Sequence, residues 1–356
     1  MPELFLTIFF ISILLFFLGT GVWVAISMIG VSAIGMIIFT SRPVGDAMAT
    51  TIWGTSSSWT LTALPLFVWM GEILFRTKLS ENLFKGLSPW MSRLPGGLIH
   101  VNVVGCALFA AISGSSAATV ATVGKMSIPE LRKRKYPEKL ILGSLAGSGT
   151  LGLLIPPSII LIIYGVTVQE SIAKLFIAGI LPGIMIAIFF MFYVIGWSLV
   201  NKKEMPKVTE TFSFSKKIKD SGQLIPVIVL ITAVIGSIYA GIATATEAAS
   251  LGVVGALILS FFQKSLTREN FKLSLLGATK TSCMIAFILA GSSFLSLAMG
   301  FTGLPRNLAI WIQEMNLSPY LLIFVLTIFY IILGMFLDGI SAVVLTMAII
   351  EPMIRQ

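Results

Sequence analysis

Apolar stretches long enough to cross a lipid bilayer recur along this chain, with only short polar linkers between them. A transmembrane helix needs about 20 mostly apolar residues to span a hydrocarbon core of about 30 Å. Because charged residues make up only 11% of the chain, against about 25% in a soluble domain, they cannot cover a water-soluble surface. We therefore expect an all-α polytopic membrane protein whose apolar segments are 4–18, 22–39, 59–76, 97–113, 116–130, 140–164, 172–200, 223–241, 243–263, 273–300 and 319–351.

The net charge of +9 does not indicate a nucleic-acid-binding protein, because the basic residues gather in the short linkers. Lys and Arg mark cytoplasmic loops of membrane proteins. The loops 132–139 and 202–219 are therefore predicted to be cytoplasmic, and the loop 302–319 to lie outside. Cys106 and Cys283 are isolated thiols inside apolar segments and indicate neither a disulfide framework nor a metal site.

The pair of segments 97–113 and 116–130 is typical of a re-entrant hairpin. Each arm has about 16 residues, or roughly 24 Å of helix, which is short for a span. The arms meet at a polar tip made of Ser113, Gly114, Ser115 and Ser116. Such exposed backbone is tolerated at membrane depth only where protein buries it or where it lines a watery cavity.

A weak internal repeat indicates a second hairpin. The sequence that starts at Thr77 resembles the one that starts at Thr302, an offset of 225. The same offset carries the tip at Ser113 onto Asp338-Gly339 and on to Ser341, in the middle of the last apolar segment. The predicted spans between the copies are odd in number, so the copies should have opposite orientations. Inverted repeats with interrupted helices are typical of secondary transporters.

A run of small residues followed by two prolines lies within the segment 140–164. The sequence from Ala146 to Ser158 contains Gly147, Ser148 and Thr150 and then Pro156-Pro157. Because proline has no N–H and obstructs the preceding turn, the helix should open around Gly147 to Thr150, facing the tip 113–116. Carbonyl and hydroxyl oxygens there would suit an alkali cation. A simple kink with glycines for close helix packing is the alternative.

Charged residues within apolar segments are costly, and this makes them functional candidates. Asp338 is the strongest of them, with a structural hydrogen bond as its alternative. Glu247 and Glu72 lie nearer the ends of segments, where helix capping or packing explains them equally well. Lys280 can reach the cytoplasmic surface with its long side chain. The one histidine, His100, is interpreted as a packing residue rather than a proton carrier.

A series of short motifs extends over nearly the whole chain. The motifs are Ala63-Leu-Pro-Leu-Phe67 with Gly71, Pro95-Gly-Gly97, the run Phe109 to Thr119, Ile128-Pro129, Gly149-Thr-Leu-Gly152, Ile155-Pro-Pro-Ser158, Tyr164-Gly165, Leu175 to Gly179, Pro182-Gly183 and Thr246-Glu-Ala-Ala249. In these motifs and in their order the chain resembles the large membrane subunit of tripartite ATP-independent periplasmic (TRAP) transporters. One departure is Thr244-Ala-Thr-Glu247, where the family usually has Thr-Pro-Thr-Glu.

The resemblance implies a sodium-driven elevator-type transporter in the bacterial inner membrane. Its transport domain would hold the first hairpin and broken helix, 95–165, and the second hairpin, 319–356. Scaffold helices would occupy 1–94 and 166–318. The family continues into a second helix broken by Pro-Pro, so the chain looks like a C-terminally truncated copy. The implied partners are a small four-helix membrane subunit and a periplasmic substrate-binding protein, in addition to membrane lipid.

Site residues follow from the motifs and the resemblance together. The substrate, a C4-dicarboxylate, a sialic acid or a similar small carboxylate, is expected at residues Ser115, Ser116, Pro157, Ser158 and Ser341. Na⁺ is the expected coupling ion, with candidate ligands at Ser113, Gly114, Ser115, Gly147, Ser148, Thr150, Asp338 and Gly339.

Other classes of protein remain as alternatives. An ion channel can also build a filter from polar hairpin tips, and a different ion-coupled anion transporter is equally compatible with the pattern. An intramembrane serine hydrolase needs a base paired with its nucleophile. The only histidine is His100 and no Gly-x-Ser-Gly sequence occurs, so we do not expect an enzyme.

Overall fold

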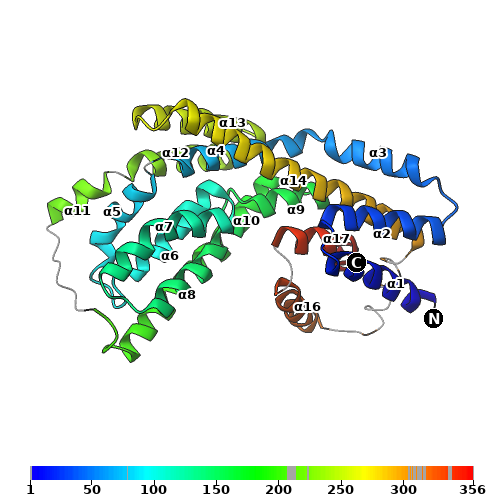
Figure 1. The fold of residues 1–356 in the computed structure, drawn as a ribbon, viewed down its shortest axis with the longest axis horizontal. Coiled ribbons are helices and arrows are strands. Elements are labelled where there is room, and N and C mark those ends of the chain that lie inside the picture. Colours follow the sequence, from blue (N-terminus) through cyan, green and yellow to red (C-terminus); the bar gives the residue numbers. More distant parts are fainter. Residues whose placement is uncertain are drawn as a thin grey trace. The chain divides into compact units, whose positions relative to one another are not determined.

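The structure is a computed structural model that describes residues 2–77, 79–206, 214–222, 224–303, 318–335 and 339–355, together with residues 305, 307, 310 and 315. These residues form helices joined by short connections, and no strand occurs among them (Figure 1). Contacts between residues divide the chain into two compact units. One unit comprises 62–162 and 171–281, and the other comprises 1–61, 163–170 and 282–356.

Several described helices are long and apolar enough to cross a membrane. Three qualify singly by length and composition: α10 (Ile172–Val200), α13 (Ala245–Phe262) and α14 (Arg268–Thr302). A further candidate is the pair made of α3 (Val44–Ser56) and the stretch Trp59–Phe75, which is bent by 53°. Shorter apolar helices accompany them. This confirms the predicted all-α polytopic membrane fold.

The unit 62–162 and 171–281 contains a three-helix bundle. Its helices are α6 (Ile99–Ser113), α7 (Ser116–Lys133) and α8 (Glu138–Gly149), and each packs against the other two. The turn from α7 to α8 carries an ion pair between Arg132 and Glu138. The hydrogen bond from Arg132 holds the pKa of the Glu138 carboxyl below its usual value.

Other helices of this unit surround the bundle or form a layer of their own. The helix α4 (Ala63–Phe75) packs against both α6 and α13, while α12 (Ile225–Tyr239) packs against α13. Two short amphipathic helices, α5 (Leu79–Met91) and α11 (Phe214–Ser221), pack against each other. Their contact includes a hydrogen bond of 2.7 Å from the Trp90 indole to Ser221.

The other unit contains the first and the last described helices of the chain, together with the central segment 163–170. The helices α1 (Pro2–Gly19) and α2 (Val24–Phe39) pack side by side, and α2 also packs against α3. The final pair of helices, α16 (Pro319–Gly334) and α17 (Gly339–Arg355), pack against each other. Val168, from the end of α9 (Ile159–Val168), packs with Met347 and Ile350 of α17.

The predicted segments correspond to helices with two kinds of difference. No apolar segment is predicted at α3, because its Asp, Thr, Gly and Ser residues lower its mean hydropathy. The stretches of α5 and α11 are predicted as loops, because the charges of each helix obscure its one apolar face. The predicted division into 1–94, 95–165, 166–318 and 319–356 concerns which parts move together and stays a prediction.

Candidate functional site

The tip of the first hairpin is a tight turn between two capped helices. The helix α6 ends at Ser113, and Gly114 follows with φ +57°, a left-handed conformation that glycine adopts without strain. Ser115 then caps α7, because its hydroxyl accepts a hydrogen bond of 3.4 Å from the Ala118 N–H. The turn thus satisfies part of the backbone at both helix ends.

The helix that carries Pro156-Pro157 is interrupted in two steps. The α-helix α8 ends at Gly149, inside the predicted interval Gly147 to Thr150, and a 3₁₀ turn, η2 (Thr150–Leu153), follows it before the chain leaves helical geometry over residues 154–158. A proline removes the hydrogen bond to the carbonyl four residues earlier, so Pro156 and Pro157 act on Gly152 and Leu153. The Leu153 carbonyl accepts a hydrogen bond of 2.5 Å from the Ser158 hydroxyl instead.

The hairpin tip contacts this break directly. The backbone N–H of Ile159 donates a hydrogen bond of 3.3 Å to the Gly114 carbonyl. Gly152 lies so close to the tip that a Cβ atom there would stand 2.8 Å from the Ser115 carbonyl carbon. A Cβ on Gly114 would similarly meet the Pro157 carbonyl oxygen at 2.8 Å. Glycines on both sides therefore permit the contact, which the sequence analysis expected between these two motifs.

Two residues at the tip were not among the predicted site residues. Thr119 is fully buried, and its hydroxyl lies 2.9 Å from that of Ser113. Gly71 of α4 brings that helix against the tip, because a Cβ there would stand 3.0 Å from the Ser113 Cα. Both belong to motifs that carry the family resemblance. Neither has a charge or a repeat to mark it as part of a site.

The predicted residues before the break have hydroxyls that bond within their own helix. Ser148, which is fully buried, donates to the Ser144 carbonyl, and Thr150 donates to the Gly147 carbonyl at 2.6 Å. The tip and the break thus bring together Ser113, Gly114, Ser115, Ser116, Pro157 and Ser158. Gly147, Ser148 and Thr150 lie at the last turn of α8 or just after it.

The second predicted tip lies in the other unit. Gly339 begins α17, and Ser341 in its first turn is buried. Asp338 lies outside the described residues. Behind the tip, the Tyr330 hydroxyl of α16 and the Thr346 hydroxyl of α17 are 2.7 Å apart. Thus α16 ends at Gly334 and α17 begins at Gly339, while residues 336–338 between them lie outside the described residues and the inverted orientation of the repeat stays a prediction.

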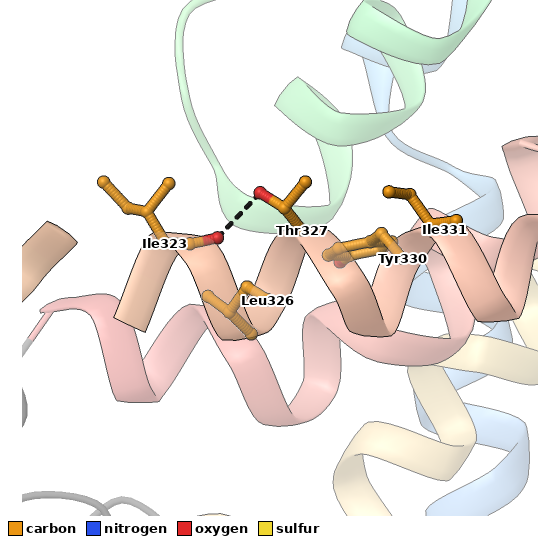
Figure 2. Close-up of a pocket in the computed structure, with 5 residues that line it drawn as sticks. All are labelled: Ile323, Leu326, Thr327, Tyr330 and Ile331. Carbon is orange, nitrogen blue, oxygen red and sulfur yellow. Dashed lines mark hydrogen bonds between the residues drawn. The ribbon is translucent and has the colours of Figure 1, made fainter. Parts of the chain in front are cut away.

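A shallow apolar hollow on α16 contains none of the predicted site residues. Figure 2 shows its five lining side chains, all from this one helix. Its hydroxyl groups belong to Tyr330 and to Thr327, whose hydroxyl donates a hydrogen bond of 2.7 Å to the Ile323 carbonyl. A surface of this kind suits apolar chains better than a small anion.

The remaining singled-out groups have structural partners. Glu247 completes a capping box at the start of α13, where its carboxylate accepts a hydrogen bond of 2.8 Å from the Thr244 N–H. Glu72 forms an ion pair of 3.0 Å with Arg76. His100 is fully buried, and its Nε2 lies 2.8 Å from the Pro95 carbonyl oxygen. Capping and packing therefore explain these three positions.

The oxygen atoms at the tip and the break are hydroxyls and carbonyls. These are hard, neutral ligands of the kind that the sequence analysis assigned to an alkali cation. In the described part of the chain, no group of three or more His, Cys, Asp and Glu side chains lies close enough to hold a metal ion. The donor set therefore fits a weakly held monovalent cation better than a transition metal.

Comparison with known proteins bears on the family of this chain. Residues 11–356 match the family model described as "Tripartite ATP-independent periplasmic transporter, DctM component". The C4-dicarboxylate TRAP transporter large permease protein DctM of Pseudomonas aeruginosa is 31% identical over 321 residues, which cover 90% of this chain and 74% of the relative. The sialic acid TRAP transporter large permease protein SiaM of Vibrio cholerae is 29% identical and covers 94% of this chain and 78% of its own length.

A third relative is a longer protein. The isethionate TRAP transporter permease protein DctMQ of Oleidesulfovibrio alaskensis is 30% identical over 344 residues, which cover 96% of this chain and 53% of the relative. The family model covers nearly the whole chain, and the match includes the hairpin, the Pro-Pro break and the second hairpin. The chain therefore belongs to the family of the large membrane permease subunit, the DctM component, of tripartite ATP-independent periplasmic transporters.

Proposed function

We propose that this protein imports a small organic acid across the bacterial inner membrane, driven by a sodium gradient. The observation that carries the proposal is the contact between the tip 113–116 and the break 154–158 in a helix rich in small residues. It gathers hydroxyl and carbonyl oxygens from two interrupted helical segments, the arrangement that secondary transporters use for substrate and coupling ion. The named relatives that carry a C4-dicarboxylate or a sialic acid support a carboxylate as the substrate.

In this proposal, some of the candidate residues bind Na⁺ and others bind the substrate. In one unit, Ser113, Gly114 and Ser115 at the tip, together with Gly147, Ser148 and Thr150, would hold Na⁺. In the other unit, Asp338 and Gly339 at the second tip are separate candidate ligands for Na⁺. Sodium, when bound, supplies positive charge beside a carboxylate. The hydroxyls of Ser115 and Ser116 would donate hydrogen bonds to the carboxylate oxygens beside the ring of Pro157, and that of Ser158 would do so in place of its bond to the Leu153 carbonyl. Ser341, in the other unit, is a separate candidate for the same role.

The proposal includes an elevator mechanism and two partners. The segments 95–165 and 319–356 would move together as the transport domain against the other helices. A periplasmic binding protein would deliver the substrate, and a small four-helix membrane subunit would complete the permease. The tripartite composition in the family description and the longer DctMQ relative support this assembly. The channel alternative differs in one respect, since it predicts ion flow without solute exchange.

Transport by the complete system reconstituted in proteoliposomes tests the proposal. We expect uptake of one carboxylate from a panel of C4-dicarboxylates and sialic acids, only with an inward Na⁺ gradient. We also expect exchange of labelled for unlabelled solute across the membrane. Conductance without this exchange would establish a channel. Uptake that is equally fast in K⁺ would refute sodium coupling.

A pair of variants tests the placement of the site. Ser115→Ala combined with Thr150→Ala removes two of the candidate hydroxyls, so the Na⁺ concentration needed for half-maximal uptake should rise. The control is Ser198→Ala in α10, whose hydroxyl bonds only to the Ile195 carbonyl of its own helix and which should not change that concentration. An unchanged sodium dependence in the double variant would show that the site lies elsewhere.

A further inference from the structure

Unpartnered polar groups lie deep within the three-helix bundle, away from the hairpin tip. The Oδ1 of Asn102, the Oγ of Ser127 and the Oγ1 of Thr122 are buried and have no hydrogen-bond partner within the protein. Asn102 and Ser127 are fully buried and Thr122 is 3% exposed. A buried polar atom without a partner is costly and calls for an explanation such as bound water or an ion.

The register between the helices places Asn102 and Ser127 at the same level, that is, at the same height along the axis of the bundle. Gly105 of α6 lies opposite Val123 of α7, and Gly124 of α7 lies opposite Leu145 of α8. Since α7 runs antiparallel to both neighbours, one further turn along it brings Ser127 to the level of Asn102 on α6. On α8 that level is occupied by Ser144, whose hydroxyl accepts a hydrogen bond of 2.9 Å from the Asn102 amide.

The third group lies at a second level, one turn nearer the tip. The same register brings Thr122 opposite Cys106 of α6 and the last turn of α8. There the fully buried Ser148 lies beside the Cys106 thiol. We call the six residues of the two levels the polar seam: Asn102, Cys106, Thr122, Ser127, Ser144 and Ser148.

The chemistry of the polar seam favours water over a cation. The three helices run through both levels, with α8 ending at Gly149 just past the second level. Pro129 leaves the Lys125 carbonyl of α7 without its helical hydrogen bond, but most other carbonyls are engaged within the helices, so the ligands left are mainly side-chain oxygens. A dehydrated cation needs more oxygens than these. Water needs two to four polar partners and both donates and accepts. It can therefore donate to the Asn102 Oδ1 and also bond with the Ser127 hydroxyl.

We propose that the polar seam is an internal water-binding site, in which water bridges Asn102 to Ser127 and also bonds Thr122. This site lies along the arms of the hairpin rather than at the tip. It shares Ser148 with the proposed sodium site but needs no assumption about the transported solute. It explains why a hairpin in an apolar protein keeps three hydroxyl or amide groups in its interior. It also extends a hydrated environment from the arms of the hairpin toward its tip.

X-ray radiolytic footprinting of the purified protein in detergent tests this proposal, because radicals formed from bound water oxidise nearby sulfur atoms. Cys106 and Met36 are both fully buried, and Met36 lies in an apolar cluster with Phe294 and Ala298. A thiol reacts with hydroxyl radicals faster than a thioether does, so the rate of each residue is divided by its rate in the denatured protein. We expect the corrected rate of Cys106 to exceed that of Met36 several-fold. Equal rates in the wild-type protein would overturn the proposal.

Apolar substitutions provide a second test of the same proposal. The triple variant Asn102→Leu, Thr122→Val and Ser127→Ala removes the three unpartnered groups, and Cys106 oxidation should fall to the rate of Met36. If the triple variant aggregates in size-exclusion chromatography, Thr122→Val alone should lower the Cys106 rate. No change in a folded variant would refute the water site. Slow Cys106 oxidation, together with a rise in melting temperature with Na⁺ that Ser127→Ala abolishes, would show a cation site instead.

Discussion

The two hairpins have similar sequence patterns but very different surroundings. In the first, α6 buries most of its residues against α4, α7, α8 and α10, and its tip contacts the break between η2 and α9. In the second, none of the residues 319–334 of α16, all of which the structure describes, is buried. The contacts of α16 with α17 and with Tyr164 and Val168 leave much of its apolar surface exposed. A hairpin pattern therefore does not by itself establish how firmly the protein holds the hairpin.

Removing one aromatic ring from each hairpin should give the largest contrast. Phe109 in α6 is fully buried and Phe324 in α16 is 61% exposed. Phe109→Ala leaves a cavity and should lower the free energy of unfolding by about 3–5 kcal/mol. Phe324→Ala removes few protein contacts and should cost less than about 1 kcal/mol. Equilibrium unfolding in mixed detergent micelles measures both, and equal losses would contradict the comparison.

The contact between the first tip and the break should give the next largest effect. In Gly152→Ala the new Cβ meets the Ser115 backbone, which cannot move aside as a flexible side chain could. We expect a loss of about 1–3 kcal/mol from overpacking, together with lower transport. Gly143→Ala in α8 is the matched control, because nothing lies within 4 Å of its Cβ position. Ala is the better helix former by about 1 kcal/mol, so this control should be neutral or stabilising.

If Gly152→Ala and Gly143→Ala melted at the same temperature in detergent, the tip would not be packed tightly against the break. The distinction between the two hairpins would then rest on α6 alone. A selective loss of transport in Gly152→Ala, with unchanged stability, would assign the contact to function rather than to packing.

Removing one hydroxyl from the hydroxyl pair of each hairpin should give the smallest difference in lost stability between the two hairpins. Thr119→Val keeps the shape of the side chain but removes the fully buried partner of Ser113, and should cost about 1–1.5 kcal/mol. Tyr330→Phe removes the bond to Thr346, whose hydroxyl still bonds the Ala342 carbonyl, so we expect about 0.5 kcal/mol. Thermal unfolding followed by intrinsic fluorescence compares them. A larger loss for Tyr330→Phe would reverse the proposed order of the hairpins.

Part of the candidate site could be predicted because its signals are local. Small polar residues between two apolar arms indicate a helix, a turn and a second helix, which the structure confirms at the first tip. Two adjacent prolines require an interruption wherever they occur in a helix. The α-helix ends at Gly149, within the predicted interval, and a 3₁₀ turn then carries the chain to Leu153 before the prolines.

Thr119 and Gly71 lay beyond sequence reasoning because their roles depend on other helices. The importance of Gly71 arises from the approach of α4 to the Ser113 backbone, and that of Thr119 from a hydroxyl six residues away across a turn. Glu247 shows the opposite case. Its role as a cap was one of two readings of Thr244-Ala-Thr-Glu247, and the capping box in the structure selects it.

The sequence by itself determined the membrane class, the helical composition, both interruptions and the family of this protein. These properties follow from apolar run length, scarce charge and proline chemistry, all of which act over a few neighbouring residues. Only the tertiary structure decided that Gly152 meets Ser115, that α6 is buried while α16 is exposed, and that a polar seam lies inside the first hairpin. These features depend on the register and close approach of helices, which packing between distant parts of the chain establishes.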